Sequence, residues 1–88
     1  MKKLTSLVAS LLFISYLFAQ NCEVEMESIK DTYTGDCKKG KASGKGKAIG
    51  TDTYEGDFKA GLPEGTGNYV WSNGSRFNGE FSGGLRDG

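Results

Sequence analysis

Residues 54–61 read Tyr-Glu-Gly-Asp-Phe-Lys-Ala-Gly, and altered copies of this stretch occur twice more in the 88-residue chain. The copy at 33–40 reads Tyr-Thr-Gly-Asp-Cys-Lys-Lys-Gly, and the copy at 77–84 reads Phe-Asn-Gly-Glu-Phe-Ser-Gly-Gly. A period slightly above about twenty residues is typical of arrays in which each unit buries its apolar face against its neighbours. The chain is therefore predicted to present a surface rather than to enclose a reaction site.

The second copy predicts an antiparallel hairpin. Tyr54, Gly56 and Phe58 alternate with two carboxylates, which puts them on one face of a strand. Residues 59–65 are expected to form the turn, where glycines supply positive φ and a proline ends the pairing. The residues that follow, up to Trp71, alternate again and form the return strand.

Asn73-Gly74 is a strong signal for a further chain reversal, so hairpin follows hairpin. The predicted fold class is all-β, an antiparallel meander of successive hairpins preceded by an N-terminal signal helix. The third copy stops halfway at Gly88, which is expected of a longer array or enzyme truncated at that point.

Glycines recur at fixed places, two residues after each opening aromatic. A strand glycine needs close packing against its bare backbone, so we expect rings of one hairpin to lie over glycines of its neighbour. The predicted structural spine of the repeats is Tyr33, Gly35, Tyr54, Gly56, Phe58, Gly65, Gly67, Tyr69, Trp71, Phe77, Gly79 and Phe81.

The N-terminus has the layout of a secretory signal. Residues 1–19 combine a basic start, an apolar run and the small residue Ala19, and are predicted to be a cleaved signal peptide. An uncleaved membrane anchor is the alternative. Residues 20–32 form an acidic N-terminal arm, and the expected location is secreted, periplasmic or in the cell envelope.

Two cysteines, Cys22 and Cys37, would reach an oxidising compartment after export, where a disulfide is plausible. Such a bridge would pin the arm onto the first repeat, and two free thiols are the alternative. Two cysteines without any histidine cannot build a metal site at this spacing, so no metal and no cofactor is predicted.

Tyr-x-Gly-x-Phe followed by Gly and by Gly-x-Gly, at a period just over twenty residues, resembles the MORN (membrane occupation and recognition nexus) repeat. The resemblance covers 33–53, 54–76 and 77–88, with Cys37 departing from the pattern. It implies an elongated, twisted sheet of hairpins. It also implies a scaffold for protein contacts, sometimes at membranes, and a role beside enzymes such as lipid kinases without being their catalytic part.

Catalytic and nucleotide-binding chemistry has little support in the chain. Residues 35–42 miss a phosphate-binding loop because Ala42 stands where a serine or threonine should hold magnesium. No histidine is available as a base, and Glu55 and Asp57 are better explained as solvated charges on a sheet. Without residues 1–19 the chain loses two of its 11 basic groups against 11 acidic ones, so a charge of −2 disfavours nucleic acid.

The favoured function is an exported, non-catalytic scaffold with an unknown protein partner. The alternative is binding to an anionic membrane surface, where each lysine of a basic cluster contributes roughly 1 kcal/mol. The lysines available for it in the first repeat are Lys38, Lys39, Lys41, Lys45 and Lys47.

Overall fold

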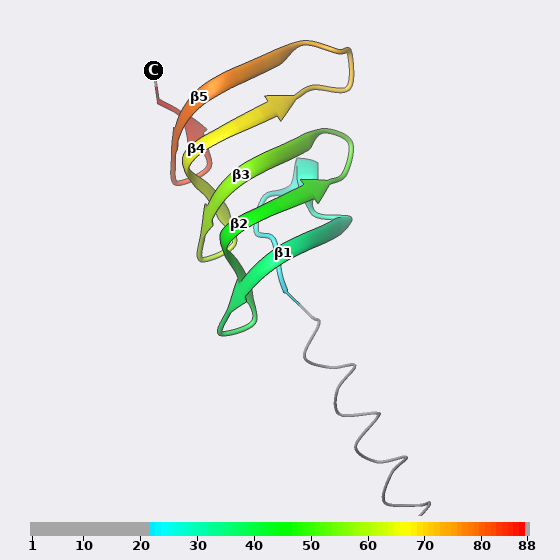
Figure 1. Ribbon diagram of the computed structural model, residues 1–88. Helices are drawn as coiled ribbons and strands as arrows, with labels where there is room; N and C mark the ends of the chain where they lie inside the picture. Colours follow the sequence, from blue (N-terminus) through cyan, green and yellow to red (C-terminus); the bar gives the residue numbers. More distant parts are fainter. Residues whose placement is uncertain (1–21, 88) are drawn as a thin grey trace, which may run out of the picture.

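The computed structural model describes residues 22–87. Within them, residues 32–86 form one antiparallel sheet with strand order β1-β2-β3-β4-β5-β6 (Figure 1). A single 3-10 turn, η1 (Glu27–Ile29), precedes it. The predicted all-β meander is confirmed, whereas the predicted signal peptide lies outside the described residues. The strands are β1 (Thr32–Lys38), β2 (Lys41–Ile49), β3 (Thr53–Lys59), β4 (Leu62–Val70), β5 (Arg76–Ser82) and β6 (Leu85–Arg86).

Two-residue turns close the hairpins at one end of the sheet. Ala60 (φ 52°) and Gly61 (φ 87°) join β3 to β4, and residues 39–40 and 83–84 join the other two pairs with the same signs of φ. Positive φ at both positions is the turn geometry that matches the twist of paired strands. The prediction of a turn over 59–65 is wrong in extent, because β4 already begins at residue 62.

Pro63 does not end the pairing, contrary to the sequence prediction. It lies fully buried within β4, opposite Phe58 of β3. Lys59 and Leu62 flank the two-residue turn and form a hydrogen-bonded pair. In an antiparallel ladder the next pair, Phe58 with Pro63, is not hydrogen-bonded. The missing N–H of Pro63 therefore costs no bond to β3.

At the opposite end of the sheet, residues 71–75 join β4 to β5. The N–H of Gly74 donates to the Trp71 carbonyl (2.9 Å), and the N–H of Ser75 donates to Oδ1 of Asn73 (2.9 Å). The chain reverses at Asn73-Gly74 as predicted, in a longer connection than the two-residue turns at the other end of the sheet.

A row of glycines crosses the sheet, one from each of the first five strands. The registers pair them in sequence, Gly35 with Gly46, Gly46 with Gly56, Gly56 with Gly67, and Gly67 with Gly79. A methyl group at Gly46 would overlap the Tyr33 ring, and one at Gly67 would overlap the Tyr54 ring. The rings thus lie flat on bare backbone, which closely packed side chains would prevent.

The glycines under each ring belong to its own hairpin, not to the neighbouring hairpin as predicted. The hydroxyl of Tyr54 donates to the Asp57 carbonyl (2.8 Å), and that of Tyr33 donates to the Asp36 carbonyl (2.6 Å). Each hydroxyl therefore bonds three residues ahead on its own strand, which lays the ring along that strand and over the glycine of its partner strand.

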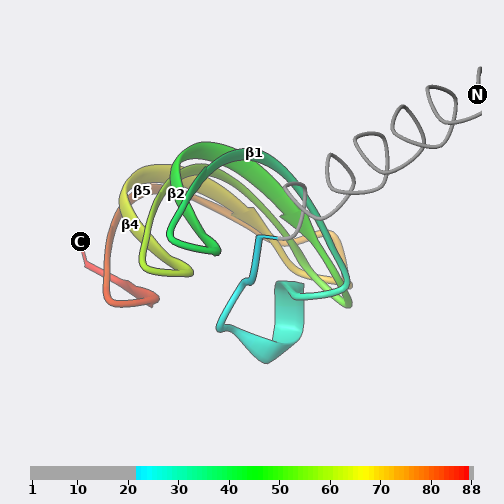
Figure 2. The ribbon, with the colours of Figure 1, turned by 90° about the horizontal axis from the view of Figure 1, so that it is seen from below.

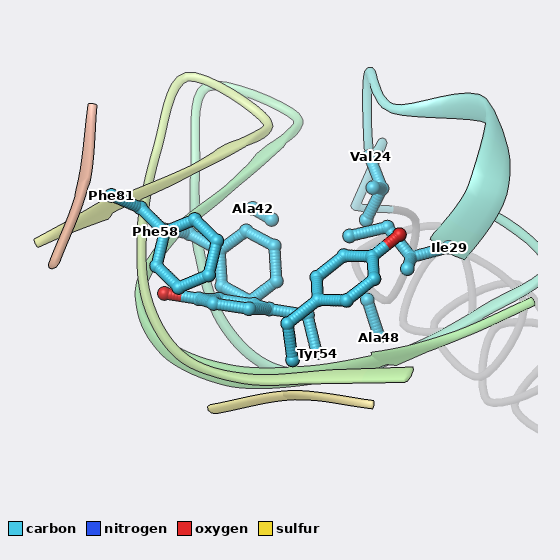
Figure 3. Packing of buried hydrophobic residues seen from close by; sticks show 8 residues of the cluster. Val24, Ile29, Ala42, Ala48, Tyr54, Phe58 and Phe81 are labelled. Carbon is cyan, nitrogen blue, oxygen red and sulfur yellow. The ribbon is translucent and has the colours of Figure 1, made fainter. Parts of the chain in front are cut away.

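The sheet curves, and the described part of the arm (residues 22–31) lies inside the curve (Figure 2). The concave face carries the core, and Val24 and Ile29 from the arm pack with Tyr54 and Phe58 from β3 (Figure 3). The alternation predicted for β3 is confirmed, since Tyr54 and Phe58 are buried while Glu55 is exposed. The remaining buried apolar residues are Ala42, Ala48, Tyr69 and Phe81.

Candidate functional site

The arm runs across the hairpin turns through backbone hydrogen bonds. The N–H of Glu23 donates to the carbonyl of Gly40 (2.8 Å), and the Glu23 carbonyl accepts from the N–H of Ala42 (2.9 Å). The N–H of Glu25 donates to the carbonyl of Gly61 (2.8 Å) in the next turn. The concave face therefore already holds one extended peptide segment, supplied by the chain itself.

Side chains of the arm pack against the concave face of the first two repeats. Val24 and Ile29 are buried, and Met26 packs beside them. Beyond them the hydroxyl of Tyr69 lies 2.7 Å from Oγ of Ser28 and 2.7 Å from Oδ2 of Asp52. These polar contacts fix the arm against the return strand of the second repeat.

A disulfide joins Cys22, at the start of the described arm, to Cys37 in β1. The two Cα atoms are 5.8 Å apart, within the usual range for such a bond. The arm is thus attached covalently to the first repeat, in addition to its backbone bonds.

Aromatic rings form a continuous line along the concave face. Tyr33 meets Phe58 edge to face (centroids 5.2 Å apart), and Phe58 meets Tyr54 (5.0 Å). Tyr54 meets Phe81 (5.0 Å), which meets Phe77 (5.6 Å). Edge-to-face pairs each stabilise by about 0.5–1.5 kcal/mol beyond their buried area. The line brings together rings from all three repeats.

Where the arm turns away from the row of hairpin turns, at Met26, the concave face opens into a cleft of about 210 Å³, here named the C-terminal cleft. Leu85, at its margin, is 73% exposed. The guanidinium of Arg86 lies over the Trp71 ring, 5.1 Å from its centroid, and 5.7 Å from the Phe77 centroid. The residues lining the cleft are Met26, Tyr69, Trp71, Phe81, Gly84, Leu85 and Arg86.

Of the cleft residues, the sequence analysis names Tyr69, Trp71 and Phe81 as part of the spine, and the structure places all three in or against the core; it does not name Arg86. The sequence does contain a signal for it. In the first two repeats, the residue two positions after the turn glycine (Gly40 or Gly61) is apolar. Ala42 and Pro63 hold that place and are buried, whereas the third repeat has Arg86. A cation at an otherwise apolar position marks this end of the face as different.

The five lysines of the first repeat do not form one cluster. Lys38, Lys39 and Lys41 surround the first turn, whereas Lys45 and Lys47 project from the middle of β2. Nζ of Lys41 forms an ion pair with Oε2 of Glu25 (2.6 Å), and Nζ of Lys45 forms one with Oδ1 of Asp57 (2.6 Å). The charges of two of the five lysines, Lys41 and Lys45, are therefore compensated locally.

The two carboxylates of β3, Asp57 and Glu55, lie beside lysines of β2. The Asp57 side chain accepts from Nζ of Lys45 and from the N–H of Thr66, and both contacts hold its pKa below the ordinary value. Glu55 stands opposite Lys47 in the register with β2.

Within residues 22–87 no group of acids, cysteines or histidines is arranged to hold a metal ion, and no helix there is long and apolar enough to span a bilayer.

Tyrosine ionisation should unfold the protein in alkali. Burial, and then the Asp57 charge, raises the pKa of Tyr54 to about 12 from an ordinary 10.0, and burial also raises the pKa of Tyr33 and Tyr69. Between these pH values the unfolded chain releases protons that the folded chain retains, so stability is lost as pH rises from 10 to 12. Absorbance at 295 nm should show a late tyrosine titration, with a melting temperature that falls over the same range. Tyrosines that all titrate near 10 without loss of folding would contradict this.

Comparison with protein families supplies the context for this geometry. The MORN repeat family model matches residues 33–52, 54–76 and 77–88, which is more than half of the chain. A comparison with curated proteins finds no matching relative. The family is generally non-catalytic, and its repeats indicate an interaction or binding role. With its hairpin meander and these three matches, the chain belongs to the MORN repeat family.

Proposed function

We propose that the chain is an exported, non-catalytic scaffold that holds a partner polypeptide on its concave face, at the C-terminal cleft. The observation that carries this proposal is the unequal covering of the face. The arm is bonded to the first two hairpin turns, while Trp71 of the second repeat and Leu85 of the third border an open cleft beyond Met26. A half-buried aromatic ring and an exposed leucine beside a cation form the kind of apolar surface that is typical of protein-binding sites.

Export is supported by two features that agree. The N-terminal sequence has the layout of a secretory signal, and disulfides such as Cys22–Cys37 persist mainly in oxidising compartments. The family itself supports the absence of catalysis, because its members are generally non-catalytic.

Panning a library of random linear peptides on the immobilised, oxidised chain tests the proposal. The chain has one tryptophan, Trp71, which borders the cleft and so reports its occupancy by a change in emission. We expect enriched peptides to bind saturably and to change that emission. Replacing Lys47 on the opposite face with alanine should leave their affinity unchanged.

Two results would overturn the proposal. One is the absence of any enriched peptide. The other is a set of peptides that bind without changing Trp71 emission and that lose affinity in Lys47→Ala. A parallel flotation assay with vesicles of anionic phospholipid addresses the membrane alternative, which requires salt-sensitive binding that depends on the five lysines of the first repeat, Lys38, Lys39, Lys41, Lys45 and Lys47.

A further inference from the structure

We infer that the C-terminal cleft selects an extended peptide in which acidic and apolar residues alternate, with Arg86 binding a carboxylate of that peptide. The inference rests on the proposed function and names the class of its ligand. It is argued from the chain's own arm, which has this alternation in Glu-Val-Glu-Met at residues 23–26 and lies on the same face.

The arm shows how the hairpin turns hold a peptide. Residues two apart in the arm, Glu23 and Glu25, donate their N–H groups to the carbonyls of Gly40 and Gly61. These glycines are the second residues of two successive hairpin turns. An extended backbone therefore advances by one turn for every two residues, and its side chains point alternately toward and away from the sheet.

The third turn repeats this geometry where the arm is absent. The N–H of Gly61 donates to the Ala42 carbonyl (2.9 Å), and the N–H of Gly84 donates to the Pro63 carbonyl (2.9 Å) in the same way. The arm leaves the row at η1, after Met26. No turn or loop hydrogen bond among residues 22–87 ends on the Gly84 carbonyl. Gly84 is buried but lines the C-terminal cleft, so the inferred ligand would donate to this carbonyl from within the cleft.

The side chains of the arm define what such a ligand presents. Val24 points inward and is buried, while the outward carboxylate of Glu25 bonds Nζ of Lys41 (2.6 Å). The same chemistry recurs at the third turn. The cleft bordered by Trp71 and Leu85 accepts an apolar side chain, and a cation stands beside it.

Arg86 is that cation. Its guanidinium carbon lies 5.1 Å from the Trp71 ring centroid and 5.7 Å from the Phe77 ring centroid, and a guanidinium held against rings in this way keeps N–H groups able to donate. It forms no ion pair within residues 22–87. A carboxylate can meet a guanidinium through two parallel bonds, which gives direction as well as affinity.

Three acetylated and amidated pentapeptides test the inference. Glu-Val-Glu-Met-Glu copies residues 23–27 of the arm, and its Gln-Val-Gln-Met-Gln and Lys-Val-Lys-Met-Lys counterparts change only the charge. Fluorescence polarisation of the labelled peptides gives affinity, and Trp71 emission reports the place of binding. We expect the acidic peptide to bind about tenfold more tightly than the glutamine peptide, and the lysine peptide to bind least.

The chain offers a matched control, because its two arginines lie at opposite ends of the last hairpin. Arg86→Gln should remove the tenfold preference for the acidic peptide while leaving the glutamine peptide nearly unchanged. Arg76→Gln should change neither affinity, and Arg86→Lys should restore only part of the preference. Equal binding of the acidic and glutamine peptides, or a preference that survives in Arg86→Gln, would overturn the inference but leave the proposed function standing. If none of the peptides binds and panning also yields no ligand, both fail.

Discussion

Gly56→Val should abolish the folded state. A Cβ added to Gly56 would stand 2.5 Å from Cα of Gly67 and 2.5 Å from the Thr66 carbonyl oxygen, both in the backbone of β4. Neither atom can withdraw without breaking the β3–β4 ladder at the centre of the glycine row. The expected cost is at least about 3 kcal/mol, and a core this small supplies only about 3–5 kcal/mol in total. Circular dichroism during heating should therefore show no cooperative transition.

Gly79→Val is the matched control, since Gly79 holds the same place in the third repeat. The nearest atoms to a Cβ there belong to the end of the half-buried Phe77 ring, the closest at 2.9 Å, because among residues 22–87 no strand pairs with this part of β5 on its outer side. That ring can turn aside, so we expect a loss of about 1 kcal/mol and a retained transition. Similar melting temperatures for the two variants would show that the glycine row does not control the packing.

The spacing of a few residue types was enough to predict the meander. Tyr54 and Phe58 alternate with the charged Glu55 and Asp57, so only the strand face that carries the two rings can be buried in the core. The positions of turns were harder to predict. Pro63 was assigned to a turn by its general preference, although the pairing pattern of an antiparallel ladder leaves places where a missing N–H costs nothing.

Contacts between distant segments could not be predicted in detail. The direction of the Tyr54 ring depends on its bond to the Asp57 carbonyl, a rotamer choice that the sequence pattern does not determine. The path of the arm depends on carbonyls exposed at Gly40 and Gly61, which become visible only when the turns have a known geometry. The C-terminal cleft was missed for the same reason, because it exists only where the arm ends.

Breaking the disulfide should destabilise the protein by about 3 kcal/mol, because the bond closes a loop with a sequence separation of 15 residues. In the chain-entropy account this loss arises mainly in the unfolded state, which becomes free to expand. A core this small supplies only about 3–5 kcal/mol by itself, so the reduced chain loses a large share of its total stability. Urea denaturation with and without reductant should show a much lower midpoint in the reduced sample.

The double variant Cys22→Ser/Cys37→Ser separates the bond from side effects of the reductant. It should unfold at the midpoint of the reduced chain and should not respond to reductant. Val24 and Ile29 are buried in the apolar core, a contact that does not itself require the bond, so we expect the arm to stay on the concave face in the molecules that remain folded. Trypsin cleavage after Lys30 should then increase only in proportion to the unfolded fraction. Cleavage that increases while the sheet stays folded would mean that the disulfide, rather than burial, holds the arm in place.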